Sequence, residues 1–263
     1  MKKIGLALGG GGARGLCEVV FIQALDELNV RPSVISGTSM GAIIGAFYAS
    51  GMSGAEMERM VKKIGLIDLG KMVDFKLFSK SALLRGHGVE EFLQEKIPFE
   101  TFEELEIPLK IVTTNFWDRR QVVVDSGPLM PAIRSSISLP AIFEPVSTEG
   151  AVLIDGGAVN PLPYDIIRES CDVLIAIDVS GVKTPRDKSP IPNMFESIMS
   201  TFEIMQASIV ESKMKISRPD IYVKPSLENI QILEFNRYAE ILKRARGHVE
   251  PFKTEMRRHL QTR

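Results

Sequence analysis

The sequence predicts an α/β fold with a mainly parallel central sheet. Short apolar segments alternate with helical segments along most of the chain, which is the pattern of repeated strand–helix units. Glycine-rich turns follow the first two apolar segments directly, and residues 173–177 are apolar without interruption, as is typical of a buried parallel strand. A chain of 263 residues with 44% hydrophobic residues is long enough to form one such domain around a large core.

Each of the first two predicted strands leads into a glycine motif. Residues 4–8 form the first strand, and the sequence GGGARG follows at residues 10–15. The apolar segment from 15 to 28 predicts a helix, and residues 34–36 predict the second strand. The sequence GTSMG at residues 37–41 comes next and opens a further helix.

The rest of the chain divides at a loop. Residues 181–192 are rich in prolines and charges, which is typical of an exposed loop. We therefore expect residues 1–180 to form the core and residues 181–263 to form a helical extension packed on the same domain. Thr101 caps a short helix in an irregular region before the strands resume. Further strands are predicted at residues 109–114, 121–124, 151–154, 173–177 and 221–223, and further helices at residues 129–137, 194–215 and from 237 onward.

Composition excludes several classes of protein. The formal net charge is −1 with no dominant basic block, so we expect no nucleic-acid partner. The two cysteines, Cys17 and Cys171, have no metal-site spacing, and we expect reduced thiols and no metal. The apolar run at residues 4–8 is too short for a signal peptide, and no stretch of 18 uncharged apolar residues exists. These observations predict a cytoplasmic protein.

The turn at residues 37–41 predicts nucleophilic chemistry at Ser39. A serine on a sharp strand-to-helix turn is held clear of the backbone, and the flanking Gly37 and Gly41 let that turn form. The hydroxyl also lies at a helix N-terminus, where N–H groups favour developing negative charge. The pattern indicates a serine acyl hydrolase.

Three motifs in order give the chain a family resemblance: GGGARG at 10–15, GTSMG at 37–41 and DGG at 155–157. Together they resemble the patatin-like phospholipase family, and similar sequence extends over roughly residues 3 to 180. The resemblance implies a three-layer α/β/α sandwich with a mainly parallel central sheet. It also implies hydrolysis of carboxylic esters of lipids, as by a phospholipase A or lysophospholipase, without a metal or cofactor.

The resemblance implies a role for each motif residue. Ser39 would be the nucleophile and Asp155 its general base, in a Ser–Asp dyad. Arg14 would either stabilise the glycine loop or meet a substrate phosphate, and the sequence favours neither role. The glycines would form the oxyanion hole, at Gly10, Gly11 and Gly12, and shape the motif turns, at Gly15, Gly37, Gly41, Gly156 and Gly157.

The histidine inventory agrees with a dyad independently of the resemblance. A serine triad needs a histidine within hydrogen-bond reach of the serine. The chain has three histidines, His87, His248 and His259, and none follows a predicted strand. Asp155 instead ends an apolar strand, which suits a carboxylate at the sheet edge.

Three alternatives remain at this stage. The spacing Gly10-x-Gly12-x-x-Gly15 also fits a dinucleotide site, but no acidic residue ends the second strand. An α/β-hydrolase with a Ser-His-Asp triad would carry its nucleophile after several strands, later than residue 39. A catalytically weak regulatory or lipid-binding protein of the same fold is the third. We expect a lipid or acyl-ester substrate, and a peripheral membrane contact and the oligomeric state stay open.

Overall fold

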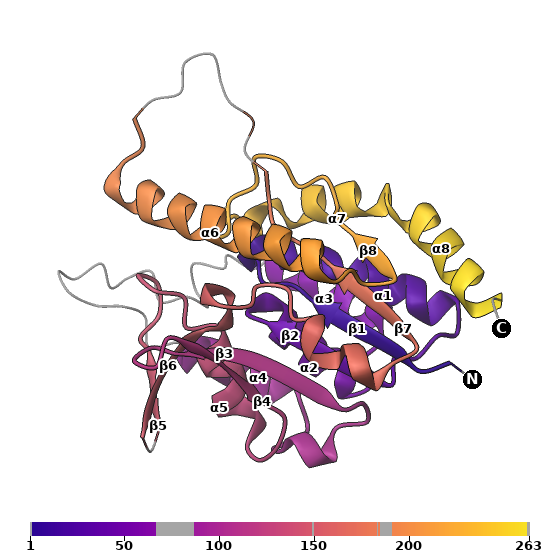
Figure 1. The fold of residues 1–263 in the computed structure, drawn as a ribbon, viewed down its shortest axis with the longest axis horizontal. Coiled ribbons are helices and arrows are strands. Elements are labelled where there is room, and N and C mark those ends of the chain that lie inside the picture. The colour runs from indigo at the N-terminus through magenta and orange to yellow at the C-terminus, as the bar shows by residue number, and fades with distance from the viewer. Residues whose placement is uncertain (1, 67–86, 149, 183, 185–190, 262–263) are drawn as a thin grey trace.

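A single eight-stranded sheet organises the protein. The computed structural model describes residues 2–66, 87–148, 150–182, 184 and 191–261 (Figure 1). The strands lie in the order β5-β6-β3-β2-β1-β7-β8, and β4 pairs with β3 beside this path. Their bounds are β1 Ile4–Leu8, β2 Val34–Thr38, β3 Leu109–Asn115, β4 Arg120–Val124, β5 Val146–Thr148, β6 Ala151–Asp155, β7 Val173–Ile177 and β8 Ile221–Val223.

The sheet is mixed and mostly parallel, as the sequence predicts. The pairs β1–β2, β1–β7, β2–β3 and β7–β8 are parallel, whereas β3–β4, β3–β6 and β5–β6 are antiparallel. All five residues of β1 are buried, which explains its uninterrupted apolar sequence. The sequence analysis missed β5, whose three residues include an exposed serine and threonine and carry no apolar pattern.

Helices cover both faces of the sheet (Figure 1). Leu6 and Leu8 pack into the larger hydrophobic cluster with α1 and α2, whereas Ala7 faces a smaller cluster that includes Val210 of α6. This alternation along β1 makes the three layers of an α/β/α sandwich. The α-helices are α1 Glu18–Glu27, α2 Met40–Ala49, α3 Gly54–Leu66, α4 His87–Lys96, α5 Leu129–Ser136, α6 Met194–Ile216, α7 Tyr238–Arg246 and α8 Val249–Gln261.

Short 3-10 turns supply much of the backbone near the motifs. The helix expected over residues 15–28 begins as a 3-10 turn, η1, and becomes α1 only at Glu18. The basic helix expected from residue 237 is two helices, because α7 ends at Arg246 and α8 begins at Val249. The 3-10 segments are η1 Gly12–Cys17, η4 Phe102–Glu104, η5 Gly156–Ala158, η6 Asp165–Ser170 and η7 Phe235–Arg237.

The register of β3 brings two distant parts of the chain together. One edge of β3 pairs with β4 over residues 111–115. The other edge pairs first with β2, where Val112 lies opposite Thr38, and then with β6, where Thr113 lies opposite Asp155. Because β2 and β6 point toward each other along this edge, their carboxyl ends meet. The residue after Thr38 is therefore a close neighbour of Asp155.

The C-terminal third is built into the same body. β8 extends the sheet by pairing with β7, and Val223 is buried in the larger cluster. Helix α8 packs on α1 through Phe252 and Phe21, whose rings lie 5.6 Å apart in an edge-to-face arrangement. Within the described part of the chain, no helix is both long and apolar enough to cross a membrane.

Candidate active site

Ser39 lies on a strained turn between β2 and α2. Its φ of 55° and ψ of −121° are unusual for a residue other than glycine, and such strain persists only where the surroundings hold it. The Ser39 N–H donates to the Ser136 hydroxyl oxygen at 2.9 Å, and that hydroxyl donates to the Val112 carbonyl at 2.7 Å. The turn is thus fixed to β3 and α5, and the Ser39 side chain stands at the N-terminus of α2.

The glycines around Ser39 are required by close backbone packing. A Cβ atom on Gly37 would lie 2.4 Å from the Gly41 carbonyl oxygen, and one on Gly41 would lie 2.3 Å from the Leu8 carbonyl oxygen. Both distances are too short for two atoms that are not bonded to each other. The GTSMG sequence is therefore explained by the contact between the start of α2 and the end of β1.

Asp155 ends β6 and is almost completely buried. Its Oδ1 accepts a hydrogen bond from the Gly157 N–H at 2.7 Å, and its main-chain carbonyl accepts one from the Thr114 hydroxyl at 2.9 Å. Burial raises the pKa of the carboxyl to about 6, although hydrogen bonds with the Ser39 side chain and the Gly157 N–H act in the opposite direction. A carboxylate of this kind is a stronger base than an ordinary aspartate.

The turn after Asp155 is as tightly packed as the turn at Ser39. A Cβ atom on Gly156 would lie 2.2 Å from the Val112 carbonyl oxygen. One on Gly157 would lie 2.1 Å from Nε2 of Gln206, which belongs to α6. The DGG motif therefore allows β3 on one side and α6 on the other to approach the carboxylate.

The glycine loop lies beside the nucleophile. A Cβ atom on Gly10 would be 3.2 Å from the Ser39 Cβ. The Gly10 N–H already donates to the Pro161 carbonyl at 2.8 Å, so Gly10 is not the free oxyanion donor that the sequence analysis expected. Within the described residues, the N–H groups of Gly11 and Gly12 have no hydrogen-bond acceptor. These two groups are available to an oxyanion.

Arg14 is buried, and its guanidinium group already has protein partners. Its Nη1 forms an ion pair with the Glu203 carboxylate of α6 at 2.8 Å and donates to the Ile230 carbonyl at 3.1 Å. Of the two roles that the sequence left open, this geometry favours support of the glycine loop over contact with a substrate phosphate.

The histidines show no link to Ser39 in the described residues. His248 Nε2 accepts a long hydrogen bond from the Ser226 N–H at 3.3 Å. His259 lies in α8, where its carbonyl accepts from Lys2. His87 begins α4, and its side chain falls outside the described part of the structure. Across the described residues, no cluster of histidine, cysteine and carboxylate side chains could hold a metal ion.

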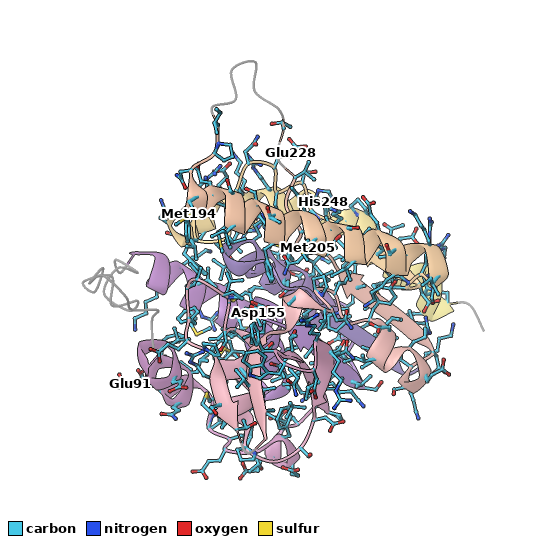
Figure 2. All side chains as sticks on the ribbon, turned by 60° about the vertical axis from the view of Figure 1, so that its left-hand side comes forward. Glu91, Asp155, Met194, Met205, Glu228 and His248 are labelled. Atoms are coloured by element: carbon cyan, nitrogen blue, oxygen red, sulfur yellow. The ribbon has the colours of Figure 1, made fainter. Side chains whose placement is uncertain are left out.

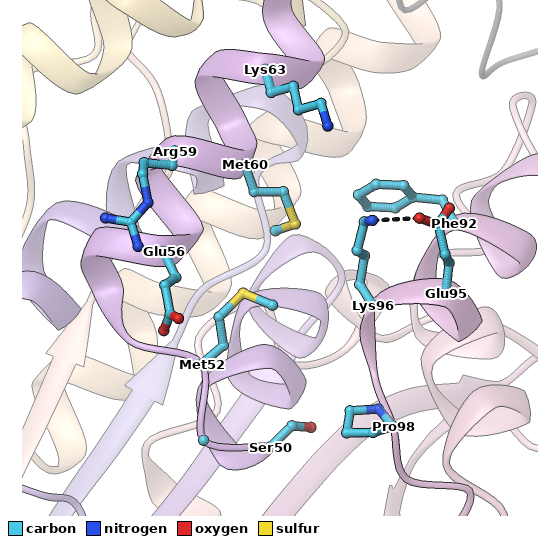
Figure 3. Close-up of a pocket in the computed structure, with 11 residues that line it drawn as sticks. Ser50, Met52, Glu56, Arg59, Met60, Lys63, Phe92, Glu95, Lys96 and Pro98 are labelled. Atoms are coloured by element: carbon cyan, nitrogen blue, oxygen red, sulfur yellow. Dashed lines mark hydrogen bonds and ion pairs between the residues drawn. The ribbon is translucent and has the colours of Figure 1, made fainter.

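A cavity lined by residues of α3 and α4 lies apart from this site, and Figure 3 shows the residues that line it. It has a volume of about 680 Å³, and its walls include Met52, Met60 and Phe92 from α3, α4 and the segment before α3. Its lining includes Ser50, which follows the last residue of α2, whereas Ser39 precedes the first residue of that helix. A ten-residue helix is about 15 Å long, so the cavity and the serine lie at opposite ends of α2.

Sequence reasoning missed three residues around the site. Glu203 and Gln206 lie on α6, a helix that the sequence predicts but whose packing it does not. Glu18 is completely buried at the start of α1, and neither of its carboxyl oxygens has a hydrogen-bond partner in the described residues. The Glu18 carboxyl lies beside Gly15 of the glycine loop. A single carboxylate among apolar neighbours was the only signal for Glu18, and such residues are usually exposed.

The fold is an α/β/α sandwich in which Ser39 and Asp155 follow or end neighbouring strands of one sheet. The sequence model of the patatin-like phospholipases matches residues 6–167, which is more than half of the chain. The protein therefore belongs to the patatin-like phospholipase family, as its motifs predict.

Curated relatives are similar to this chain over most of its length. It is 28% identical to lysophospholipase NTE1 of Kluyveromyces lactis, over 91% of this chain and 18% of that protein. It is 32% identical to an uncharacterized NTE-family protein of Mycobacterium tuberculosis, over 73% of this chain and 53% of that protein. The chain thus spans less than a fifth of the length of the yeast lysophospholipase.

Solved structures share the fold. VipD from Legionella pneumophila superposes with a TM-score of 0.52 at 14% identity, over 95% of this chain and 67% of that chain. ExoU from Pseudomonas aeruginosa, in complex with SpcU, superposes with a TM-score of 0.52 at 16% identity, over all of this chain and 53% of that chain. These similarities support the sandwich architecture.

Proposed function

We propose that the protein hydrolyses carboxylic esters of lipids through an acyl-enzyme on Ser39, with Asp155 as the general base. The observation that carries the proposal is the meeting of β2 and β6 on one edge of β3, which brings the Ser39 side chain near enough to Asp155 to lower the pKa of its carboxyl. Family membership and the similarity to a protein named lysophospholipase support the choice of a lipid ester.

In the first half of the proposed reaction, Asp155 accepts the Ser39 proton as the serine Oγ attacks the ester carbonyl. The oxyanion that forms is held by the N–H groups of Gly11 and Gly12, and one donor of this kind is worth about 3 kcal/mol. The protonated Asp155 then gives its proton to the leaving alcohol. This leaves the acyl group on Ser39.

In the second half, a water molecule takes the place of the alcohol. Asp155 accepts a proton from water while the water oxygen attacks the acyl carbon, and Ser39 leaves with the proton that Asp155 returns. The raised pKa of Asp155, about 6, suits both directions of transfer near neutral pH.

The side chains on the outer face of α6 are an argument for an amphiphilic substrate. Several large apolar side chains are exposed along this helix, which also contacts the site through its inner face. We propose that this face contacts the lipid phase from which a substrate is taken. The exposed residues are Met194, Phe195, Ile198, Ile204, Met205 and Ile216.

Hydrolysis by wild-type and Ser39→Ala protein tests the proposal. We expect release of fatty acid from lysophosphatidylcholine and of p-nitrophenol from a p-nitrophenyl ester, both reduced at least a thousandfold in Ser39→Ala. Ser50→Ala is the matched control, because the Ser50 hydroxyl donates to the Ala46 carbonyl at the far end of the same helix. Equal activity in Ser39→Ala, or lipid binding by wild type without turnover, would contradict the proposal and favour a lipid-binding role.

A further inference from the structure

One face of α6 spans both halves of the candidate active site. Glu203 pairs with Arg14 behind the glycine loop, and Lys213 donates to the Asn160 side chain at 2.5 Å and to the Leu162 carbonyl at 2.7 Å. Gln206 lies between them, and Val210 is buried in the smaller core cluster. Spacings of three and four residues place all four on the same helical face. This helix lies beyond residue 167, where the family match ends.

Gln206 is the member of this face that meets the carboxylate. A Cβ atom on Gly157 would lie 2.1 Å from Gln206 Nε2 and 2.9 Å from Asp155 Oδ1, so the carboxamide and the carboxylate border the same small space. Figure 2 shows Asp155 under α6, with Met205 on the helix above it.

Gln206 is mostly buried, and its carboxamide has spare hydrogen-bonding capacity. Only 8% of the residue is exposed. Among the described residues, its amide has no hydrogen-bond partner, and the amide nitrogen and oxygen are not completely shielded from solvent. A buried amide without a protein partner is stable when a water molecule or a ligand completes its hydrogen bonds. The space beside Asp155 is where such a molecule would lie.

Deacylation needs a water molecule in that space. The water must point one hydrogen at Asp155 and its lone pair at the acyl carbon on Ser39, and a second hydrogen bond fixes this orientation. The Nε2 group of Gln206, which faces this space, can donate this second hydrogen bond to the other lone pair of the water oxygen. Asp155 alone leaves the water free to rotate about one hydrogen bond.

We propose that Gln206 is a further catalytic residue that holds the hydrolytic water against Asp155 during deacylation. The role rests on the acyl-enzyme described under the proposed function. One water proton passes to Asp155, the water oxygen forms the new bond to the acyl carbon, and the Ser39 oxygen leaves with that proton. The second water hydrogen stays on the product acid, and Gln206 Nε2 keeps its hydrogen bond to that oxygen until the acid departs.

The test separates acylation from deacylation in Gln206→Met, which keeps the side-chain length and removes both polar groups. Reaction with a fluorophosphonate needs Ser39 but no water, and we expect its rate to stay within twofold of wild type. Steady-state hydrolysis of a p-nitrophenyl ester should fall at least tenfold, and acylated protein should accumulate by intact mass. Ser208→Ala, two residues away on the exposed side of α6, is the control and should match wild type.

A loss of labelling and of turnover in parallel would show that Gln206 only supports the fold, and would overturn the role. Unchanged turnover would overturn it as well. If Gln206→Met does not fold, Gln206→Asn is the second variant, because it keeps the amide on a side chain that is one carbon shorter. This variant should hydrolyse the ester more slowly while its labelling rate stays normal. A wild-type protein that no fluorophosphonate labels would instead refute the proposed function itself.

Discussion

At Asp155, two opposing physical effects set the pKa of the carboxyl to a value at which it can act as a base. Burial raises the pKa to about 6, and hydrogen bonds from Ser39 and Gly157 limit the rise. Below pH 6 the carboxyl is mostly protonated and cannot accept the serine proton. We predict that kcat falls about tenfold for each pH unit below this value. A pH–rate profile between pH 4.5 and 8 measures it, and an acid limb centred near pH 4 would contradict the assignment of Asp155 as the base.

Loss of the Asp155 carboxylate should be nearly as damaging as loss of Ser39. Asp155→Asn keeps the shape and the hydrogen bond from Gly157 but removes the base, so we expect at least a hundredfold loss of kcat. His248→Ala and His259→Ala serve as controls and should keep most activity. A histidine variant as inactive as Asp155→Asn would indicate a triad, and would refute the dyad.

Glu18 gives a separate test of burial. Its pKa is raised well above the usual value because the carboxyl is removed from water. The folded protein therefore holds this proton more tightly than the unfolded chain, and the stability gained is complete below about pH 4.5 and lost as pH rises above it. The side chain of the Glu18→Gln variant cannot ionise. We therefore predict that the difference in Tm between the variant and wild type is a few degrees larger, in favour of the variant, at pH 8 than at pH 5.

Glu27→Gln is the matched control for this measurement. Glu27 ends the same helix, is half exposed and pairs with Lys253 at the surface. Its effect on Tm should be small, because exposed ion pairs contribute little to stability. A Tm difference for Glu18→Gln that does not change with pH would mean that Glu18 is ionised in the folded protein.

Among the elements, the glycine loop depends on a contact from the far end of the chain. Arg14 is paired with Glu203, so its removal should loosen the loop that carries the Gly11 and Gly12 donors. We predict that Arg14→Ala loses at least tenfold in kcat/KM, about 1.4 kcal/mol, equally on a phospholipid and on a p-nitrophenyl ester of matched acyl length. Glu203→Gln should show the same pattern with a smaller loss. A loss confined to the phospholipid would assign Arg14 to the substrate phosphate.

Elements with local signals could be predicted from the sequence. The buried strand β7 has the predicted bounds, and the Thr101 cap is present, with the Glu104 carboxylate accepting the Thr101 N–H at 2.9 Å. The break between α7 and α8 was not predicted, since the basic composition continues across it. The site motifs were found because each occupies a few consecutive residues at the end of a strand.

At the scale of the whole molecule, the sequence could not show how the motifs meet. The antiparallel entry of β6 beside β2 depends on the register of β3, which pairs residues about 40 positions apart. The crossing of α6 over both motifs depends on contacts such as Arg14–Glu203, 189 positions apart. No local pattern encodes such long-range contacts, so Gln206 and the bracing of Arg14 emerged only from the structure.

The same long-range contacts predict that the chain unfolds as one unit. We propose that residues 1–180 and 181–263 form a single domain, because β8 completes the sheet and α8 packs on α1. Circular dichroism and loss of activity should therefore give one coincident thermal transition. A chain that ends after residue 180 should not fold, since it exposes the edge of β7 and the core under α7 and α8. A soluble, cooperatively folded 1–180 fragment would contradict this view.

The central claim is that an acyl group is carried on Ser39, and mass spectrometry during turnover tests it most directly. The protein is mixed with a slowly hydrolysed ester, quenched in acid within the first turnovers and digested. We predict one acyl group on the peptide that contains Ser39, and none in Ser39→Ala or Asp155→Asn. Rapid hydrolysis with no acylated peptide, or an acyl group on another residue, would contradict the account.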